Sequence, residues 1–271
     1  MRVRDVMTTT VRTLDQHDSV ERAAGVLHFW RFRHLPVVDA KDHLVGMLTP
    51  ANLLEAARRG GELADEPVAG IMSKPVSTAR ADEAVEAAAE RMLQADVHAL
   101  PVLGEGERVV GIVTDQDLLS GLLRARRGRA AAQATTVDAL MTRDPVTIDL
   151  EATVGEATDL LLRHGFRHLP VVGPGRRLVG LVSERDLRTR LGADVRGFVH
   201  ATADALAEPV ADAMTPDPVA VEEGTPLAQA IEIFGEERVG ALPVVAGETL
   251  VGVLSYLDVL RWLREGGADE A

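Results

Sequence analysis

Residues 167–186 read RHLPVVGPGRRLVGLVSERD, in which two apolar runs rich in β-branched residues flank a Gly-Pro-Gly sequence. Apolar runs of this kind favour strands, and Gly with Pro marks a turn between them. The stretch therefore predicts a hairpin of two strands, over residues 168–172 and 177–182.

Helical patterns lie on both sides of this hairpin. Between residues 153 and 163 the apolar residues follow the 3.6-residue period, and Thr153 with Glu156 matches a capping box. Gly165 is suited to end that helix. A brief strand is expected over 145–148 and a second helix over 184–191. Together these elements give a β-α-β-β-α unit.

The unit occurs four times. Three landmarks recur in fixed order: a methionine after an apolar residue or alanine, then Leu-Pro-Val, then Val-Gly before two apolar residues. Their positions are Met7, Met72, Met141 and Met214; Pro36, Pro101, Pro170 and Pro243; and Gly46, Gly111, Gly180 and Gly252. The Met-to-Pro interval is 29 residues each time, which identifies an internal repeat.

The repeats are expected to pack in pairs, because a single core of about 60 residues rarely stabilises itself. The predicted boundaries are 1–60 for repeat 1, 67–124 for repeat 2, 136–192 for repeat 3 and 209–265 for repeat 4. Repeats 1 and 2 would form one module, 1–124, and repeats 3 and 4 a second, 136–265, with a linker over 125–135.

The repeated unit resembles the CBS domain in its apolar-Met start, its LPVV strand and its closing Gly-apolar-x-[Ser/Thr]-x-x-Asp segment. The resemblance covers nearly the whole chain, from Val3 to about Leu263. It implies a mixed α+β fold in which the repeats form two Bateman modules, each with approximate two-fold symmetry. It also implies a regulatory protein whose clefts bind AMP, ADP or ATP, the last with Mg²⁺, or S-adenosylmethionine.

The closing segment places a hydroxyl three residues before an aspartate in three repeats. These pairs are Thr114 with Asp117, Ser183 with Asp186, and Ser255 with Asp258. A hydroxyl beside the free N–H groups of a helix N-terminus suits a phosphate, and the carboxylate can accept two hydrogen bonds from a ribose diol. The resemblance implies the same roles. The pattern is also a variant capping box that needs no ligand, so both interpretations stay open.

Repeat 1 departs from this pattern, because Thr49 is followed by Pro50 and then by Asn52. Asparagine lacks the charge that strengthens a hydrogen bond to a diol. Proline at the first helical position favours a purely structural helix start. We therefore expect a degenerate site at Thr49 and Asn52.

Basic dipeptides precede the LPVV strand in the first member of each module: Arg33-His34 and Arg167-His168. The resemblance implies that residues at these positions face phosphates. Our hypothesis is a composite site in each module, with Arg33 and His34 near Asp117, and with Arg167 and His168 near Asp258 or Asp186. The alternative is that they are strand-end cations in water. Because histidine titrates near pH 6.5, charged His34 and His168 would strengthen phosphate binding below that pH.

Composition narrows the class of function. The 271 residues include 42 acidic and 29 basic side chains, a net charge of −13, which argues against nucleic acid or an anionic membrane as partner. The chain has no cysteine and no apolar run long enough to cross a bilayer, which fits a cytoplasmic protein. No familiar catalytic motif or metal-ligand set is present, so neither an enzyme nor a metal site is expected.

Two functions of a regulatory protein remain open at this point, with an enzyme whose active site is unrecognised as a third alternative. The first is a sensor that binds an adenine nucleotide and transmits the bound state by repacking its modules. The second is an interaction scaffold with partly degenerate nucleotide clefts that regulates a transporter, channel or enzyme. The chain could act as a monomer or as a homodimer.

Overall fold

The computed structural model describes residues 1–30, 32–59, 64–124, 129–191, 203–237 and 239–265. Repeat 1 contains η1 (Val3–Asp5), β1 (Leu14–Asp15), α1 (Val20–Phe29), β2 (Leu35–Val38), β3 (Leu44–Leu48) and α2 (Pro50–Arg59). Repeat 2 contains η2 (Val68–Gly70), β4 (Ala79–Arg80), α3 (Val85–Gln94), β5 (Ala99–Leu103), η3 (Glu105–Glu107), β6 (Val109–Thr114) and α4 (Asp115–Arg124).

The second half of the chain repeats this order. Repeat 3 contains η4 (Val137–Ala139), β7 (Thr142–Arg143), β8 (Ile148–Asp149), α6 (Val154–His164), β9 (His168–Gly173), η5 (Pro174–Arg176), β10 (Arg177–Ser183) and α7 (Glu184–Arg190). Repeat 4 contains η6 (Val210–Asp212), β11 (Thr215–Pro216), β12 (Val221–Glu222), α9 (Leu227–Glu237), β13 (Ala241–Ala246), β14 (Thr249–Ser255) and α10 (Tyr256–Arg264). Two further helices, α5 (Arg129–Ala134) and α8 (Ala203–Ala207), precede repeats 3 and 4. The predicted β-α-β-β-α unit is confirmed in all four.

Local sequence signals explain the best-predicted helix, α6. The Thr153 hydroxyl accepts a hydrogen bond from the Glu156 backbone N–H, the Glu156 carboxylate accepts one from the Thr153 backbone N–H, and Gly165 ends the helix in the left-handed conformation. The strand expected over 145–148 is shorter and later than predicted. Only Ile148 and Asp149 pair with β9, in parallel.

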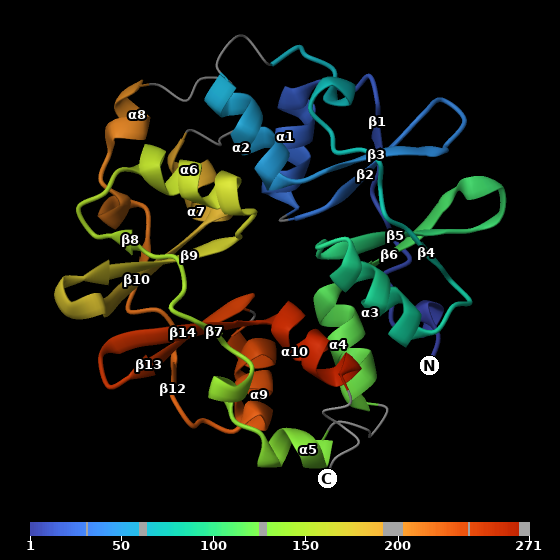
Figure 1. The fold of residues 1–271 in the computed structure, drawn as a ribbon. Helices are drawn as coiled ribbons and strands as arrows, with labels where there is room; N and C mark the ends of the chain where they lie inside the picture. Colours follow the sequence, from blue (N-terminus) through green and yellow to red (C-terminus); the bar gives the residue numbers. More distant parts are fainter. Residues whose placement is uncertain (31, 60–63, 125–128, 192–202, 238, 266–271) are drawn as a thin grey trace.

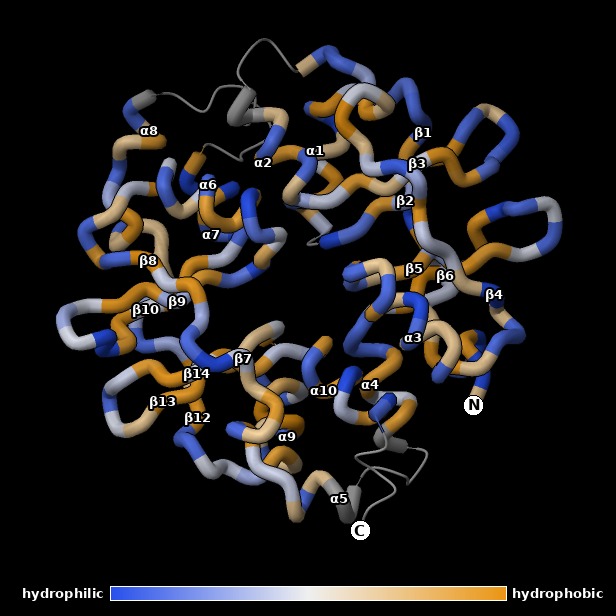
Figure 2. Tube along the Cα trace, viewed as in Figure 1, coloured by the Kyte–Doolittle hydropathy of each residue, from blue (hydrophilic) through white to orange (hydrophobic). Residues whose placement is uncertain are grey.

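The LPVV strand is the central strand of each repeat. It pairs in antiparallel fashion with the strand that follows it and in parallel with the short strand before the first long helix. In repeats 3 and 4 these strands merge with β7 and β11 into one eight-stranded sheet. Figure 2 shows these strands as hydrophobic segments, with hydrophilic residues in the hairpin turns at the outer edge.

In each pair of repeats, the methionine that marks one repeat packs against the glycine that marks the other. Each glycine lies under the methionine of its partner, so close that an added Cβ would lie within 2.6 Å of the sulfur atom. The four contacts are Gly46 with Met72, Gly111 with Met7, Gly180 with Met214, and Gly252 with Met141. These reciprocal contacts join repeat 1 to repeat 2 and repeat 3 to repeat 4, as two pseudo-symmetric modules.

This packing leads to a stability prediction. We expect Gly252→Val to lower the free energy of unfolding by about 1–3 kcal/mol, because the new side chain must displace Met141 from a packed interface. Thermal unfolding of the full chain measures the effect. Met141→Ala in the same chain should recover part of the loss, since it removes the sulfur 2.3 Å from the new Cβ position. Equal melting temperatures for Gly252→Val and the wild type would contradict the close packing of Met141 on Gly252.

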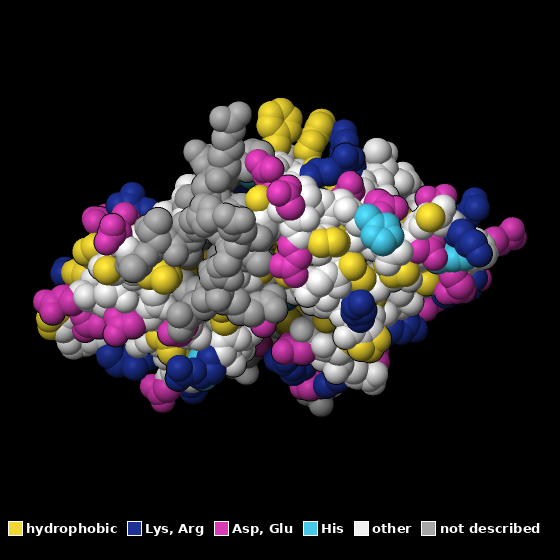
Figure 3. Space-filling view, turned by 90° about the horizontal axis from the view of Figure 1, so that it is seen from above, with side chains coloured by type: hydrophobic (Ala, Val, Ile, Leu, Met, Phe, Trp, Pro, Cys, Tyr) yellow, Lys and Arg dark blue, Asp and Glu magenta, His cyan; other side chains and the backbone are white. Residues whose placement is uncertain are grey.

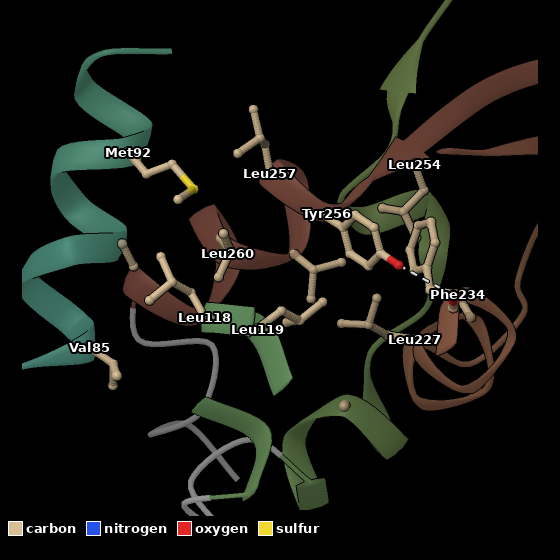
Figure 4. Packing of buried hydrophobic residues seen from close by; sticks show 14 of the residues in the cluster. Val85, Met92, Leu118, Leu119, Leu227, Phe234, Leu254, Tyr256, Leu257 and Leu260 are labelled. Carbon is tan, nitrogen blue, oxygen red and sulfur yellow. Dashed lines mark hydrogen bonds between the residues drawn. The ribbon is translucent and has the colours of Figure 1, made fainter. Parts of the chain in front are cut away.

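The two modules pack through their helices. Helix α2 contacts α6 and α7, while α10 contacts α3 and α4. Repeat 1 therefore lies against repeat 3 and repeat 2 against repeat 4, and the four repeats form a ring (Figure 1). The largest core cluster joins repeats 2 and 4. Figure 4 shows Leu257 and Leu260 of α10 in the same core as Met92 of α3 and Leu118 of α4.

The predicted linker over 125–135 contains a helix that the sequence analysis did not predict. Residues 129–134 form helix α5, which contacts α9. Its Ala132 is 2% exposed and belongs to the core that joins repeats 2 and 4. Residues 125–128 lie outside the described part of the chain. None of the described helices is both long enough and apolar enough to span a membrane.

Candidate functional site

Each of the three hydroxyl–aspartate pairs forms a complete capping box. The hydroxyls of Thr114, Ser183 and Ser255 each donate to the aspartate three residues on, over 2.7 Å. The backbone N–H of each aspartate in turn donates weakly to that hydroxyl, over 3.3–3.4 Å. The structural role thus exists without any ligand. It occupies one oxygen, Oδ2, of each carboxylate.

The other carboxylate oxygens differ among the repeats. Oδ1 of Asp258 accepts from Arg261, over 2.9 Å. Within the described part of the chain, Oδ1 of Asp117 and of Asp186 has no such partner. The cap therefore leaves one carboxylate oxygen of Asp117 and of Asp186 for another partner, whereas a ligand at Asp258 would share Oδ1 with Arg261 or displace it.

Repeat 1 keeps the cap with a different side chain. The Asn52 side-chain oxygen accepts from both the backbone N–H and the hydroxyl of Thr49, each over 2.9 Å. Its amide nitrogen donates to Ser73, also over 2.9 Å. Asn52 is thus held on both sides by neutral partners. The degenerate site expected at Thr49 and Asn52 stays a prediction.

The motif of repeat 4 lines a cleft of about 250 Å³ together with the basic dipeptide of repeat 3. Ser255 and Asp258 lie on its repeat 4 side, and Arg167 and His168 on its repeat 3 side. Apolar atoms of the residues Pro145, Val146, Phe166 and Leu257 complete the walls. The cleft therefore combines cations, a hydroxyl, a carboxylate and an apolar surface within one module.

The corresponding cleft of module 1 is larger, about 610 Å³. Its walls include Thr114 from repeat 2 and Arg33 and His34 from repeat 1. Asp117 is not among the lining residues and reaches the cleft only through the Thr114 hydroxyl that it holds. Gly240 and Tyr256 of repeat 4 also line this cleft, so it opens toward the second module.

The clefts of repeats 1 and 3 differ from these two. Thr49 lines a space of about 280 Å³ that also contains His98, Arg33 and Arg167. Ser183 lines only a narrow cavity, and Asp186 is not among its lining residues. Of the two partners expected for Arg167 and His168, the structure brings them to Asp258 in an open cleft and leaves Asp186 apart.

A buried polar cluster at the centre of the ring was missed by sequence reasoning. Asp115 is 5% exposed, lies 2.8 Å from a ring nitrogen of His98, and forms an ion pair with Arg167 of the other module over 3.5 Å. Burial alone would raise the pKa of Asp115, but the hydrogen bond with His98 and the charge of Arg167 lower it. The carboxylate is therefore ionised at neutral pH and ties repeat 3 to repeat 2.

The two histidines of the basic dipeptides are neutral at physiological pH. Burial, followed by the charge of Arg167, lowers the pKa of His34 and of His168 to about 3. The expectation that both would charge below pH 6.5 is therefore wrong for the unliganded protein, because burial and then the charge of Arg167 disfavour the charged imidazole. Burial and the charges of Arg167 and Arg185 lower the pKa of Arg33 only to about 10, so it keeps its charge.

These pKa values predict how stability depends on pH. A histidine whose folded pKa lies below its unfolded value of about 6.5 favours the folded state above that pH and opposes it as the pH falls toward 3. We expect the melting temperature to fall steadily between about pH 7 and pH 4.5, and the fall to be smaller in the His34→Gln, His168→Gln double variant. An identical pH dependence in the two proteins would contradict the assignment.

Among the described residues no group of three His, Cys, Asp or Glu side chains is arranged to hold a metal ion. A ring of four β-α-β-β-α units, with hydroxyl–carboxylate motifs at clefts shared by paired repeats, defines a tandem-repeat protein with ligand-sized internal clefts. A family model for the CBS domain matches residues 3–59, 68–124, 137–193 and 210–265. The chain therefore belongs to the CBS-domain family, and its paired repeats are Bateman modules.

Two relatives from Methanocaldococcus jannaschii are similar over most of the chain. The uncharacterized protein MJ1225 is 26% identical over 264 residues, which are 90% of this chain and 92% of the relative. The uncharacterized protein MJ1404 is 27% identical over 273 residues, which are 97% of this chain and 62% of the relative. The crystal structure of MJ1225 superposes with a TM-score of 0.86 at 24% identity, over 97% of this chain and all of that one. That likeness confirms the fold.

Some relatives carry enzyme names but match over a small part of their length. The homoserine O-acetyltransferase of Methanohalobium evestigatum is 36% identical over 116 residues, which are 43% of this chain and 23% of that enzyme. The likeness is thus confined to a segment the size of one CBS pair, and the rest of that enzyme lies outside the match.

Proposed function

We propose that this protein is a regulatory sensor that binds an adenosine-containing ligand, AMP, ADP, ATP or S-adenosylmethionine, in one composite cleft of each module. The observation that carries the proposal is that the two repeats of a module bring different candidate binding residues to one cleft. In each module the first repeat contributes the basic dipeptide to the cleft, and the second contributes Ser255 with Asp258 in module 2 and Thr114 in module 1.

The cleft of module 2 supports this assignment in chemical detail. Arg167 supplies a fixed charge for a phosphate, and neutral His168 can donate a hydrogen bond to it. The Ser255 hydroxyl and the N-terminal N–H groups of α10 lie on the opposite wall. In this proposal Asp258 holds the ribose, and Val146 with Phe166, which line the same cleft, contact the base.

Transmission of the bound state would depend on the residues that modules share. Arg167 lines clefts of both modules and pairs with Asp115 of module 1. A phosphate that binds Arg167 competes with Asp115 for the same guanidinium. Such a ligand would have different affinities for the joined and separated arrangements of this contact, which is the requirement for a shift in population.

A panel of ligands tests the proposal. The wild-type chain is heated with AMP, ADP, ATP, Mg-ATP or S-adenosylmethionine, each at millimolar concentration. A ligand that binds the native state and is present at about 100 times its own dissociation constant adds about 2.7 kcal/mol of stability. The melting temperature should therefore rise with at least one of them. Adenosine is the matched control for AMP, ADP and ATP, because it lacks their phosphate groups. No rise with any ligand at millimolar concentration would contradict the proposal.

A second candidate function is a scaffold that docks a regulated transporter, channel or enzyme. It is favoured by two exposed aromatic side chains in repeat 1: Phe29 is 77% exposed and Trp30 is 48% exposed. Arg12 lies over the Trp30 ring, 4.1 Å from its centre. On the face drawn in Figure 3, acidic and basic side chains are interspersed and hydrophobic side chains project at the upper edge.

For both candidate functions we propose a cytoplasmic location, in keeping with the lack of cysteine in the sequence.

A further inference from the structure

Arg12 brings a cation into the module 1 cleft at a position that is apolar in module 2. It lies five residues after Met7, and Val146 lies five residues after Met141. Since the methionine marks the register of the repeat, Val146 is the counterpart of Arg12. Each of the two lines the cleft of its own module. The two clefts therefore differ in chemistry at this equivalent position.

Other residues of the first repeat occupy equivalent positions in the two clefts. Phe32 and Phe166 each lie four residues before the proline of the LPVV strand, and each lines the cleft of its module. Thr8 and Thr142, each directly after the methionine, also line the two clefts. The differing position is therefore surrounded by matching residues, and it belongs to the same part of both clefts.

The guanidinium of Arg12 is positioned by an aromatic platform. Its central carbon lies 4.1 Å from the centre of the Trp30 ring. That ring is stacked on Phe32, with an angle of 12° between the two planes. Attraction to a ring face holds a guanidinium without using its N–H donors. Within the described part of the chain, these N–H groups have no hydrogen-bond acceptor or acidic partner, so they are available to a ligand.

An arginine with available N–H groups distinguishes between purine bases. Guanine presents two neighbouring acceptors, N7 and O6, which match the guanidinium in a bidentate contact. Adenine presents N7 beside an amino group, which is itself a donor and cannot accept from a second N–H. A valine side chain has no donor and makes no such distinction. The base preference of module 1 should therefore differ from that of module 2.

We propose that Arg12 makes the module 1 cleft a site for purine nucleotides of the guanine type, whose base carries an oxygen at position 6. This inference rests on the proposed function, in which Val146 and Phe166 contact the base of the ligand in module 2. It goes beyond that function because it assigns a different base preference to each cleft. Adenine nucleotides still enter both clefts, but guanine nucleotides bind more tightly in module 1. One chain then responds to both classes of purine nucleotide.

Calorimetric titration of the full chain carrying Asp258→Asn tests this preference, because that variant leaves module 1 as the tight site. A bidentate contact discriminates between bases by about fivefold to a hundredfold, so GMP should bind at least about fivefold more tightly than AMP. IMP has the same N7 and O6 acceptors without the 2-amino group of guanine, and it should bind like GMP. Equal affinities for GMP, IMP and AMP would overturn the inference.

Two substitutions at position 12 test whether Arg12 is the cause of the preference. Arg12→Gln should turn the preference towards AMP, because a glutamine amide matches N6 and N7 of adenine. Arg12→Val introduces the residue found in repeat 3 and should make GMP and AMP bind about equally. Arg22→Gln is the control and should keep the preference for GMP, since Arg22 is an exposed arginine of the same repeat that pairs with Asp18.

Failure of this inference can be told apart from failure of the proposed function. If AMP binds and the ratio of the GMP and AMP affinities is unchanged in both Arg12 variants, Arg12 does not recognise the base. The inference is then wrong, while the proposed function stands. If none of GMP, IMP and AMP binds, the inference is also wrong, and the response to S-adenosylmethionine decides the proposed function separately.

Discussion

Replacing Asp258 by Asn should weaken the binding of AMP in the module 2 cleft by roughly tenfold to a hundredfold. The reason is the loss of charge, since a hydrogen bond to an ionised group contributes about 1.5–3 kcal/mol. Isothermal titration calorimetry on the full chain measures the change. Repeat 1 already provides the precedent for the variant, because Asn52 makes the capping bonds to Thr49 with a neutral side chain.

The same precedent makes the variant a clean test of the ligand role. Asn at position 258 can still accept from Ser255, so the helix cap and the melting temperature of the unliganded protein should be nearly unchanged. Arg167→Gln should weaken AMP binding by a similar factor from the opposite wall of the cleft. If Asp258→Asn binds AMP as tightly as the wild type, Asp258 serves only as a cap.

Phe234→Ala should destabilise the protein by about 3–5 kcal/mol, the usual cost of emptying a buried phenylalanine site. Phe234 is 1% exposed, and its ring lies 4.7 Å from that of Tyr256. The Tyr256 hydroxyl donates to the Phe234 carbonyl over 3.2 Å (Figure 4). Since Tyr256 is the residue directly after Ser255, the cavity should also loosen the start of α10 and the motif in the cleft.

Chemical denaturation of Phe234→Ala and Phe234→Leu measures this effect. Leucine keeps most of the buried volume, so its cost should be well below that of alanine. Both variants should keep the same linear dependence of free energy on denaturant if unfolding stays cooperative. A loss below about 1 kcal/mol for Phe234→Ala would contradict the packing described for repeat 4.

The parts of the structure that depend on local signals could be predicted from sequence. The spacing of Met, Pro and Gly gave the four units, and Thr153, Glu156 and Gly165 gave the bounds of α6 to within one residue. The CBS fold and the pairing of repeats are confirmed. Helix α5 was missed, because a short alanine-rich segment carries no amphipathic pattern and is held by contact with α9.

The centre of the ring could not be predicted, because its residues come from both modules. Nothing in the sequence near Asp115 indicates that Arg167, 52 positions later, will form an ion pair with it. The low pKa values of His34 and His168 depend on the same burial and the same arginine. The narrowing of the Ser183 cavity likewise depends on how repeat 3 meets repeat 1. The binding roles of the site residues and the domain boundaries stay predictions.

The number of nucleotides bound per chain tests the central claim most directly. Equilibrium titration of the wild type with the tightest adenosyl ligand should reach two equivalents, one in each composite cleft. Asp258→Asn should reduce the tight class to one equivalent, and Thr114→Val, which removes a hydroxyl that lines the module 1 cleft, should do the same for that cleft. The absence of saturable binding would contradict the account. Four equivalent sites would also contradict it, because only repeats 1 and 3 carry Arg33 and Arg167 before their LPVV strands.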